Sequence, residues 1–394
     1  MKKIYLIPFI PIFFPQTAFP RQQTIFRPDG RTIDVATIDS TVNRLMHEAG
    51  VTGVCLGIVN GDTVACVRGY GKKDQSRNGR LDTSACFCAA SLSKPLFAYL
   101  VLQLVDKGVI DLDKPLCRYL PKPLPEYEQY KDLAGDDRWR RITARDCLDH
   151  TTGFPNWRRF NPHDNGKLEI FFTPGTRFAY SGEGIDLLQL VVESAAGRPL
   201  EDLAREYIFE PFGMVRTGYV WHSSFESDYA VGHDEQGKPL PKIRRAHADA
   251  AGSLETTIAD YTRFLAAVMK GRGLSQKLKR EMLSPQIGIF TKHEFPSLNL
   301  DTTGANKKIG LSYGLGWGLF ESPFGRVFFK EGHDDGWQHY CLNIPDCRDS
   351  FIVMTNSSNG ESVFKELVER LTGVEIPWEW EGYVPYQSLR REMK

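Results

Sequence analysis

Strand-forming segments lie at both ends of this chain and a helix-rich stretch lies between them, and this arrangement constrains the fold most. Near the start, two runs rich in β-branched and aromatic residues, 51–59 and 63–70, flank Asn60-Gly61, which is a strong β-hairpin signal. Further strand patterns occur in the last third, at 313–320, 326–330, 337–344 and 351–355. A hairpin, a helical interruption and then a meander predict one antiparallel sheet built from both ends of the chain.

Helical periodicity accounts for much of the remaining chain. Helices are predicted at 38–48, from Ser91 to near Gly108, at 185–196, at 200–208, at 257–269 and after Ser362. A chain of 394 residues exceeds what one hydrophobic core usually supports, so we expect two domains. The predicted fold class is α/β (α+β), an antiparallel sheet flanked by helices. Residues 30–90 and 245–394 would form the sheet domain, and residues 91–244 an inserted, mainly helical domain with the active site at the interface.

The charge balance argues against a nucleic-acid partner. The chain has 49 Lys and Arg residues and 49 Asp and Glu residues, so no net field attracts a polyanion. The arginine-rich stretch at 138–145 is interleaved with aspartates, which is typical of a solvated surface. We therefore expect no binding to nucleic acid.

The N-terminus has the pattern of a secretory signal. Two lysines at positions 2 and 3 precede a short apolar run at 4–14, which is too short to span a bilayer. We predict a signal peptide over residues 1–18, with Ala18 at the cleavage site, and hence a periplasmic or secreted protein without a stable membrane span. An uncleaved anchor is the alternative, because Pro8 and Pro11 interrupt the run.

Eight cysteines would then lie in an oxidising compartment, where disulfides are permitted. If Asn60-Gly61 is a two-residue hairpin loop, Cys55 falls opposite Cys66, close enough for a bridge. Cys341 and Cys347 flank a turn and form a second candidate pair. Free thiols that pack as small hydrophobes are at least as well supported. No spacing typical of a zinc site occurs, so no metal is predicted.

One short stretch supplies a candidate nucleophile. Ser91 is followed three positions later by Lys94, where an apolar helical pattern begins. Residues i and i+3 share a helix face, so the hydroxyl and the ammonium group can meet at the first turn. A serine nucleophile needs such a base, and N–H groups at a helix N-terminus can stabilise developing negative charge. Alone the pattern is weak, since Ser362 and Lys365 repeat it on an amphipathic helix, where we interpret it as solvated surface.

Two other segments could complete a site around Ser91. Tyr180 precedes a predicted helix, and a tyrosine there can relay a proton if a cation lies beside it. Residues 332–336 open the strand that begins at Trp337, and a strand edge beside a nucleophile can hold substrate and donate an N–H to an oxyanion. In isolation, Tyr180 would be interpreted as a core aromatic and His333 as a surface histidine.

Taken in this order, the segments resemble the serine β-lactamase and penicillin-binding-protein group. The likeness is greatest to its class C-like branch, which includes β-lactamases, D-alanyl-D-alanine carboxypeptidases, D-aminopeptidases and esterases. The family pattern is S-x-x-K, then Y-x-N, then K-T-G or H-x-G. Family-like sequence surrounds these motifs at 147–153, 174–178, 208–214 and 313–317, and the resemblance covers roughly residues 38–371. The motifs are modest singly and specific in their order and spacing.

The resemblance implies a role for each matching position. Ser91 would be the acylated nucleophile, Lys94 its base or electrostatic partner, and Tyr180 a proton shuttle. Which of Lys94 and Tyr180 is the general base stays open. The backbone N–H groups of Ser91 and Gly336 would form the oxyanion hole, and His333 would replace the lysine of K-T-G. No cofactor is implied, and the partner would be a small-molecule or peptide-like acyl substrate.

Two positions depart from the family pattern and bear on the substrate. Gly182 stands where Y-x-N has asparagine, so an amide that would bind substrate or Lys94 is missing. Asp335 stands where H-x-G has glycine, beside Asp334, and both lie at the predicted substrate site. Two negative charges there would repel the carboxylate of penicillins and D-Ala-D-Ala peptides, unless a Lys, an Arg or His333 compensates.

We therefore favour an acyl-enzyme hydrolase that cleaves an ester or an amide, related to the esterases or D-aminopeptidases. A β-lactamase or a D-alanyl-D-alanine carboxypeptidase is one alternative. The departures at positions 182 and 335 also fit a second alternative, an exported binding or sensing protein that keeps the fold without catalysis.

Two further residues look catalytic and are interpreted as structural. Ser312 lies in the G-x-S-x-G pattern of α/β-hydrolases, but a polar loop precedes it and a strand pattern follows, where that motif needs a strand and then a helix. His150 has no identifiable acidic partner, so we expect it to hold its own loop in place.

Overall fold

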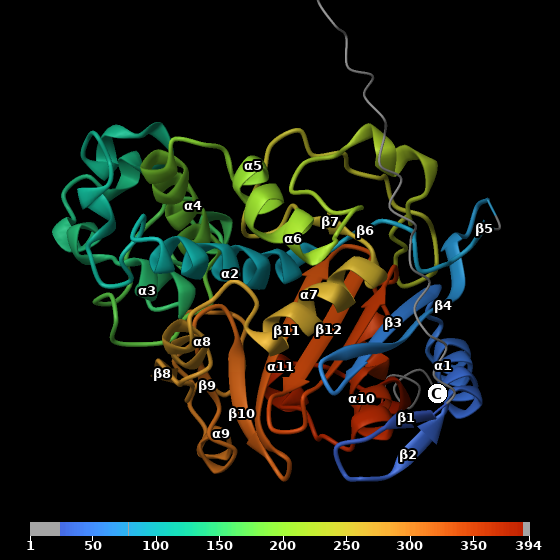
Figure 1. Cartoon of the computed structure of the whole chain (residues 1–394). Coiled ribbons are helices and arrows are strands. Elements are labelled where there is room, and N and C mark those ends of the chain that lie inside the picture. Colours follow the sequence, from blue (N-terminus) through green and yellow to red (C-terminus); the bar gives the residue numbers. More distant parts are fainter. Residues whose placement is uncertain (1–23, 78, 389–394) are drawn as a thin grey trace, which may run out of the picture.

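A nine-stranded antiparallel sheet forms the centre of the fold (Figure 1). The structure is a computed structural model that describes residues 24–77 and 79–388, so the predicted signal peptide at 1–18 lies outside the described residues. The strand order is β5-β4-β3-β13-β12-β11-β10-β9-β8. The strands are β3 (Gly53–Asn60), β4 (Thr63–Asp74), β5 (Gly79–Arg80), β8 (Ile287–Gly288), β9 (Ser312–Tyr313), β10 (Gly318–Ser322), β11 (Gly325–Asp334), β12 (Trp337–Ile344) and β13 (Asp349–Thr355).

Strands from the two ends of the chain meet at the middle of this sheet, as the sequence predicts. β3 pairs with β13 along six residues, from Val54 opposite Thr355 to Val59 opposite Ser350. Two smaller two-stranded sheets join β1 (Thr24–Phe26) to β2 (Thr32–Asp34) and β6 (Phe87–Cys88) to β7 (Glu255–Thr256). The pairing of β6 with β7 anchors the segment that leads into Ser91.

Helices cover both faces of the sheet. On one face, α7 (Ile258–Lys270) packs across β3, β4 and β13. A Cβ at Gly57 of β3 would overlap Oγ1 of Thr262 in α7, so glycine permits this close approach. On the other face, α1 (Val35–Ala49) and α10 (Phe364–Thr372) pack against each other and against the same central strands. The remaining helices are α2 (Ser93–Asp106), α3 (Ala144–Leu148), α4 (Gly182–Ala196), α5 (Leu200–Ala204), α6 (Glu210–Phe212), α8 (Gln276–Met282), α9 (Ala305–Lys308) and α11 (Trp378–Glu381).

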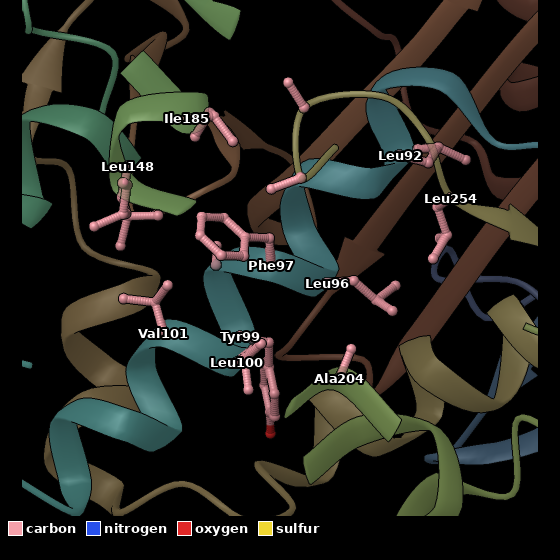
Figure 2. Packing of buried hydrophobic residues seen from close by; sticks show 14 of the residues in the cluster. Leu92, Leu96, Phe97, Tyr99, Leu100, Val101, Leu148, Ile185, Ala204 and Leu254 are labelled. Atoms are coloured by element: carbon pink, nitrogen blue, oxygen red, sulfur yellow. The ribbon is translucent and has the colours of Figure 1, made fainter. Parts of the chain in front are cut away.

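Helix α2 is buried on all sides over its first three turns. Its sequence is apolar around the whole circumference, which is typical of a helix enclosed by other elements. Figure 2 shows its side chains packed against Leu148 of α3, Ile185 of α4 and Ala204 of α5. This packing holds the N-terminal end of α2 in place, and Ser91 lies directly before that end. Within the described part of the chain, no helix combines the length and the apolar character needed to cross a membrane.

The hairpin between β3 and β4 differs from the prediction. Asn60 pairs with Thr63, so Gly61 and Asp62 form the loop rather than Asn60 and Gly61. Both loop residues have positive φ, 57° and 63°, as a tight hairpin turn with the right-handed twist of the strands requires. Asp62 tolerates this conformation because a short polar side chain adopts it at low cost.

A β-bulge next to this turn changes the pairing of the cysteines. The register shifts between Ile58 and Val59, so Cys66 lies opposite Ile58 and Cys55 lies opposite Gly69. The predicted Cys55–Cys66 juxtaposition is therefore wrong, because the turn lies one residue later than predicted and the bulge adds one residue to β4, and both changes move the two thiols apart. All eight cysteines are free in the structure.

The predicted elements differ from the structure mainly at their ends. The helices predicted at 38–48, 185–196 and 257–269 are present as α1, α4 and α7, and strand β11 continues past Lys330 to Asp334. The strand predicted at 313–320 is instead two strands, β9 and β10. The assignment of residues 91–244 to a separate helical domain stays a prediction.

Candidate active site

Ser91 lies in a 3-10 turn, Ala90–Leu92, that leads directly into α2. Ala90 has φ of 47°, in the left-handed region that residues with a Cβ rarely adopt. Such a conformation persists only where the surrounding structure holds it, and strained residues of this kind cluster at functional sites. Here Tyr261 donates a hydrogen bond to the carbonyl of Leu92 (2.9 Å), and Ser93 donates one to the carbonyl of Ala90 (2.5 Å).

Lys94 is the direct partner of Ser91. Its Nζ donates hydrogen bonds to Oγ of Ser91 (3.0 Å) and to the carbonyl of Ala251 (2.7 Å), and the residue is 1% exposed. This distance is within the range in which a base can take the proton of a nucleophile. The second S-x-x-K pair differs, because Ser362 donates to the carbonyl of Asn359 and Lys365 pairs with Glu369.

Tyr180 lies beside two ammonium groups. Nζ of Lys94 is 5.0 Å from the centre of the Tyr180 ring, and Nζ of Lys330 is 4.7 Å from it. Tyr180 is buried, lines the same cleft as Ser91, and its hydroxyl has no hydrogen-bond partner among the described residues. The structure therefore brings Ser91, Lys94 and Tyr180 together.

His150 supports the Tyr180 loop from behind. The His150 and Tyr180 ring centres are 4.4 Å apart, and Nδ1 of His150 accepts a hydrogen bond from the N–H of Ser181 (3.2 Å). Burial, together with the charges of Lys94 and Lys330, holds the pKa of His150 well below its usual value. The ring is therefore neutral with its proton on Nε2, and it positions the loop without adding a third charge.

The cleft around Ser91 has a volume of about 1530 Å³. Its lining is aromatic on one side, where Trp157, Phe160 and Phe295 lie, and acidic at the mouth of β11, where Asp334 and Asp335 lie. A volume of this size accommodates a peptide-like or drug-sized substrate.

The sequence analysis missed Lys330 and Glu331 as site residues and gave Gly332 no role of its own within the segment 332–336. A Cβ at Gly332 would lie 2.8 Å from the carbonyl oxygen of Ala89 and 3.1 Å from the nitrogen of Leu92, so β11 passes directly against the nucleophile turn at this residue. Lys330-Glu331-Gly332 matches K-x-G three positions before the H-x-G alignment at His333. The signal was present in the sequence, but it lies where the predicted strand ended.

His333 and Gly336 differ in their relation to the cleft. His333 lines the cleft, and its ring contacts Glu361 (3.1 Å) and stacks on Tyr383. The N–H of Gly336 donates to Oγ of Ser358 (3.0 Å), and Gly336 is not among the residues that line the cleft. This N–H therefore already has a partner in the structure, and the oxyanion contact of Gly336 stays a prediction.

Asp334 and Asp335, at the end of β11, contribute less negative charge to the cleft than the sequence suggests. Arg245 pairs with Asp334 (3.2 Å), which supplies the compensating arginine that the sequence analysis allowed for. The carboxylate of Asp335 is exposed and has no ion-pair partner within residues 24–77 and 79–388. Because solvent screens exposed charges, repulsion from Asp335 alone is weak.

Trp157 explains the glycine at position 182. A Cβ at Gly182 would lie 2.5 Å from Cη2 of Trp157, so the indole ring occupies the space of a side chain at this position. The N–H of Gly182 donates to the Asn156 side chain (3.1 Å), and Asn156 itself lines the cleft. The side-chain amide of Asn156, from a different loop, therefore lies beside the backbone of Gly182, the position at which the family pattern has an asparagine.

His339 couples the nucleophile segment to the sheet. Its Nε2 donates to the carbonyl of Cys88 (2.8 Å), because its Nδ1 accepts from the N–H of Thr355 (3.2 Å). Burial lowers its pKa to about 4. A histidine whose pKa falls on folding stabilises the protein fully above its unfolded pKa, about 6.5, and this contribution is lost as the pH falls toward 4.

We expect His339→Gln to weaken the acid sensitivity of the fold. Between pH 7 and pH 5, protonation of His339 in the unfolded state should cost the natural protein about 2 kcal/mol of unfolding free energy. The variant lacks this titration and should lose about 2 kcal/mol less over the same interval. Urea unfolding of both proteins at the two pH values measures this difference, and equal losses would contradict the prediction.

Ser312 does not belong to this site. It is buried in β9, its hydroxyl donates to the carbonyl of Gly310 (3.1 Å), and it is not among the residues that line the cleft. This placement agrees with its interpretation as a structural residue.

Comparisons with known proteins agree with this geometry. A sequence profile of the Beta-lactamase family matches residues 38–373. The chain is 24% identical over 362 residues to the D-alanyl-D-alanine-carboxypeptidase/endopeptidase AmpH of Escherichia coli (strain K12), covering 85% of this chain and 89% of that protein. It is 26% identical over 249 residues to esterase EstB of Burkholderia gladioli, covering 57% of this chain and 61% of that protein.

The fold also matches solved structures. The octameric penicillin-binding protein homologue from Pyrococcus abyssi superimposes with a TM-score of 0.70 at 20% identity, covering 91% of this chain and 81% of that chain. A likeness at this level of identity establishes the fold alone. The antiparallel sheet flanked by helices that the sequence predicts is thus confirmed.

Proposed function

Because the chain belongs to the Beta-lactamase family, a family of serine hydrolases, we propose that it is itself a hydrolase that forms an acyl-enzyme on Ser91. The observation that carries this proposal is the 3.0 Å hydrogen bond between Lys94 and Ser91 at the floor of an open cleft. A buried lysine held against a serine hydroxyl has a clear use in proton transfer and none in a protein that only binds ligands. This argues against the non-catalytic alternative.

In the proposed mechanism, the proton of the Ser91 hydroxyl passes to Lys94 or Tyr180 as Oγ attacks the carbonyl carbon of the substrate. The N–H groups of Ser91 and His333 would stabilise the oxyanion, since His333 directly follows the glycine that packs on the nucleophile turn. The same proton then protonates the leaving group, and water hydrolyses the acyl-enzyme by the reverse transfers.

For the substrate, we propose an ester or an amide that lacks a carboxylate beside the scissile bond. The support is an ion pair between Lys330, a buried cation beside Tyr180, and Glu331, a carboxylate that lines the cleft. Relatives named as an esterase and as a carboxypeptidase/endopeptidase set the range of chemistry to test. Penicillins and D-Ala-D-Ala peptides carry a carboxylate. For β-lactamase or D-alanyl-D-alanine carboxypeptidase activity, Lys330 would therefore have to leave its ion pair with Glu331 and bind that carboxylate.

Covalent labelling tests the proposal. We expect a fluorophosphonate to add one adduct to the natural protein and to Ser312→Ala, as measured by intact-mass spectrometry, and none to Ser91→Ala. The Ser91→Ala protein, which takes no label, should also fail to hydrolyse p-nitrophenyl esters and D-amino amides. Labelling that survives in Ser91→Ala and disappears in Ser312→Ala would overturn the assignment.

A further inference from the structure

Lys330 is a fully buried cation beside the reactive groups of the cleft. It is 0% exposed, and its Nζ lies 4.7 Å from the centre of the Tyr180 ring. Lys330 is not itself among the residues that line the cleft, but its ammonium group lies next to Tyr180, which is, so it would attract a carboxylate bound beside Tyr180, because charges interact strongly where water is excluded. The charge of Lys330 therefore bears directly on which substrates bind.

The protein supplies a carboxylate for this ammonium group itself. Glu331 forms an ion pair with Lys330, and Glu331 is also among the residues that line the cleft. Adjacent residues of a strand usually point to opposite faces, so pairing within the dipeptide requires at least one of these two long side chains to bend back toward the other. A shorter side chain at position 331 could not make this contact in the same way.

The surroundings of Glu331 keep it ionised. Burial tends to raise the pKa of Glu331, and the ion pair with Lys330 outweighs burial, so this pKa is lowered. Glu294 lies next to it, and burial together with the charge of Glu331 raises the pKa of Glu294 well above its usual value. The Lys330–Glu331 pair therefore has little net charge to offer a substrate.

We propose that Glu331 acts as a built-in substitute for a substrate carboxylate, so that the cleft selects acyl substrates without one. This inference rests on the proposed function and deepens it by naming the residue that sets the substrate class. Asp334 and Asp335, which the sequence pattern suggests would repel a substrate carboxylate, contribute less to this selection. Asp334 is paired with Arg245, and Asp335 is exposed to screening solvent.

A change of substrate preference in two Glu331 variants tests the inference. Glu331→Thr restores the K-T-G pattern and shortens the side chain, and Glu331→Gln removes the charge at nearly constant size. The probes are a penicillin and the methyl ester of its carboxyl group, which differ only in the negative charge. The measurement is the rate of Ser91 acylation by each probe, followed by intact-mass spectrometry.

We expect the acid-to-ester ratio of acylation rates to rise by about tenfold or more in both variants, because Lys330 is released to bind the carboxylate. Asp335→Asn is the matched control, since it removes a negative charge from the same cleft, and its ratio should change by no more than about twofold. An unchanged ratio in Glu331→Gln with native circular dichroism would overturn the inference, even if Glu331→Thr does not fold.

The outcomes separate this inference from the proposed function. If the natural protein reacts with fluorophosphonate at Ser91 and the ratio does not change, the hydrolase proposal stands and the role of Glu331 is rejected. If Ser91 reacts with none of the probes in any variant, both proposals fail. If the acid-to-ester ratio of acylation rates rises as much in Asp335→Asn as in Glu331→Gln, the overall negative charge of the cleft, and not Glu331 itself, selects the substrate.

Discussion

Replacing Lys94 by methionine is expected to slow acylation of Ser91 by about 10³-fold, because it removes the group that holds and accepts the proton of the nucleophile. Lys94 is buried and its Nζ has two partners, Oγ of Ser91 and the carbonyl of Ala251. Methionine has a similar length and no charge, so it fills the same space without the chemistry. Stopped-flow or quenched labelling with a fluorophosphonate measures the rate directly.

The chain contains its own control for this experiment. Lys365 follows Ser362 at the same spacing, but it pairs with Glu369 on the surface of α10. Lys365→Met should leave the labelling rate unchanged within about twofold, since a half-buried i,i+4 pair away from the cleft has no contact with Ser91. A Lys94→Met protein that folds normally and labels within tenfold of the natural rate would remove Lys94 from the mechanism.

Restoring the asparagine of the family pattern at position 182 is expected to destabilise this protein by about 3 kcal/mol. The reason is steric, because Cη2 of Trp157 lies 2.5 Å from the place of the new Cβ and the indole ring must move. Trp157 also lies 5.9 Å from Nζ of Lys94, measured to the ring centre, so its displacement should disturb the nucleophile's partner. Urea unfolding of Gly182→Asn measures the cost.

A double-mutant cycle identifies Trp157 as the cause. In a Trp157→Ala background, adding asparagine at position 182 should cost less than about 1 kcal/mol, which corresponds to a coupling of about 2 kcal/mol between the two positions. Equal costs in both backgrounds would mean that the glycine serves the backbone of α4 and not the packing of the indole ring.

The sequence singled out Ser91, Lys94 and Tyr180, which the structure brings together, because each belongs to a short local pattern. The i, i+3 spacing alone brings Ser91 and Lys94 together at a helix start, and the structure has this contact at 3.0 Å. The place of Tyr180 beside them depended on the order of motifs. The distinction between Ser91 and Ser312 also followed from local context, namely what precedes and follows each serine.

The strand that completes the site was harder to place. Alternation along a strand has a period of two, so it does not show where the strand ends, and β11 continues four residues beyond its predicted end. Because the strand was predicted to end at Lys330, the K-T-G or H-x-G motif was matched to His333, three positions after Lys330. The cysteines of the hairpin were also paired wrongly, because the turn lies one residue later than predicted and one bulged residue shifts every partner beyond it.

By itself, the amino-acid sequence determined the antiparallel sheet built from both chain ends and the helices on either side, and it selected Ser91, Lys94 and Tyr180 as candidates, because periodicity and motif order are properties of neighbouring residues. Only the tertiary structure decided how the charges of the cleft are paired. Arg245 reaches Asp334 across 89 positions, and Trp157 occupies the space beside Gly182. Such contacts depend on where distant segments meet in space, and that follows from packing of the whole chain.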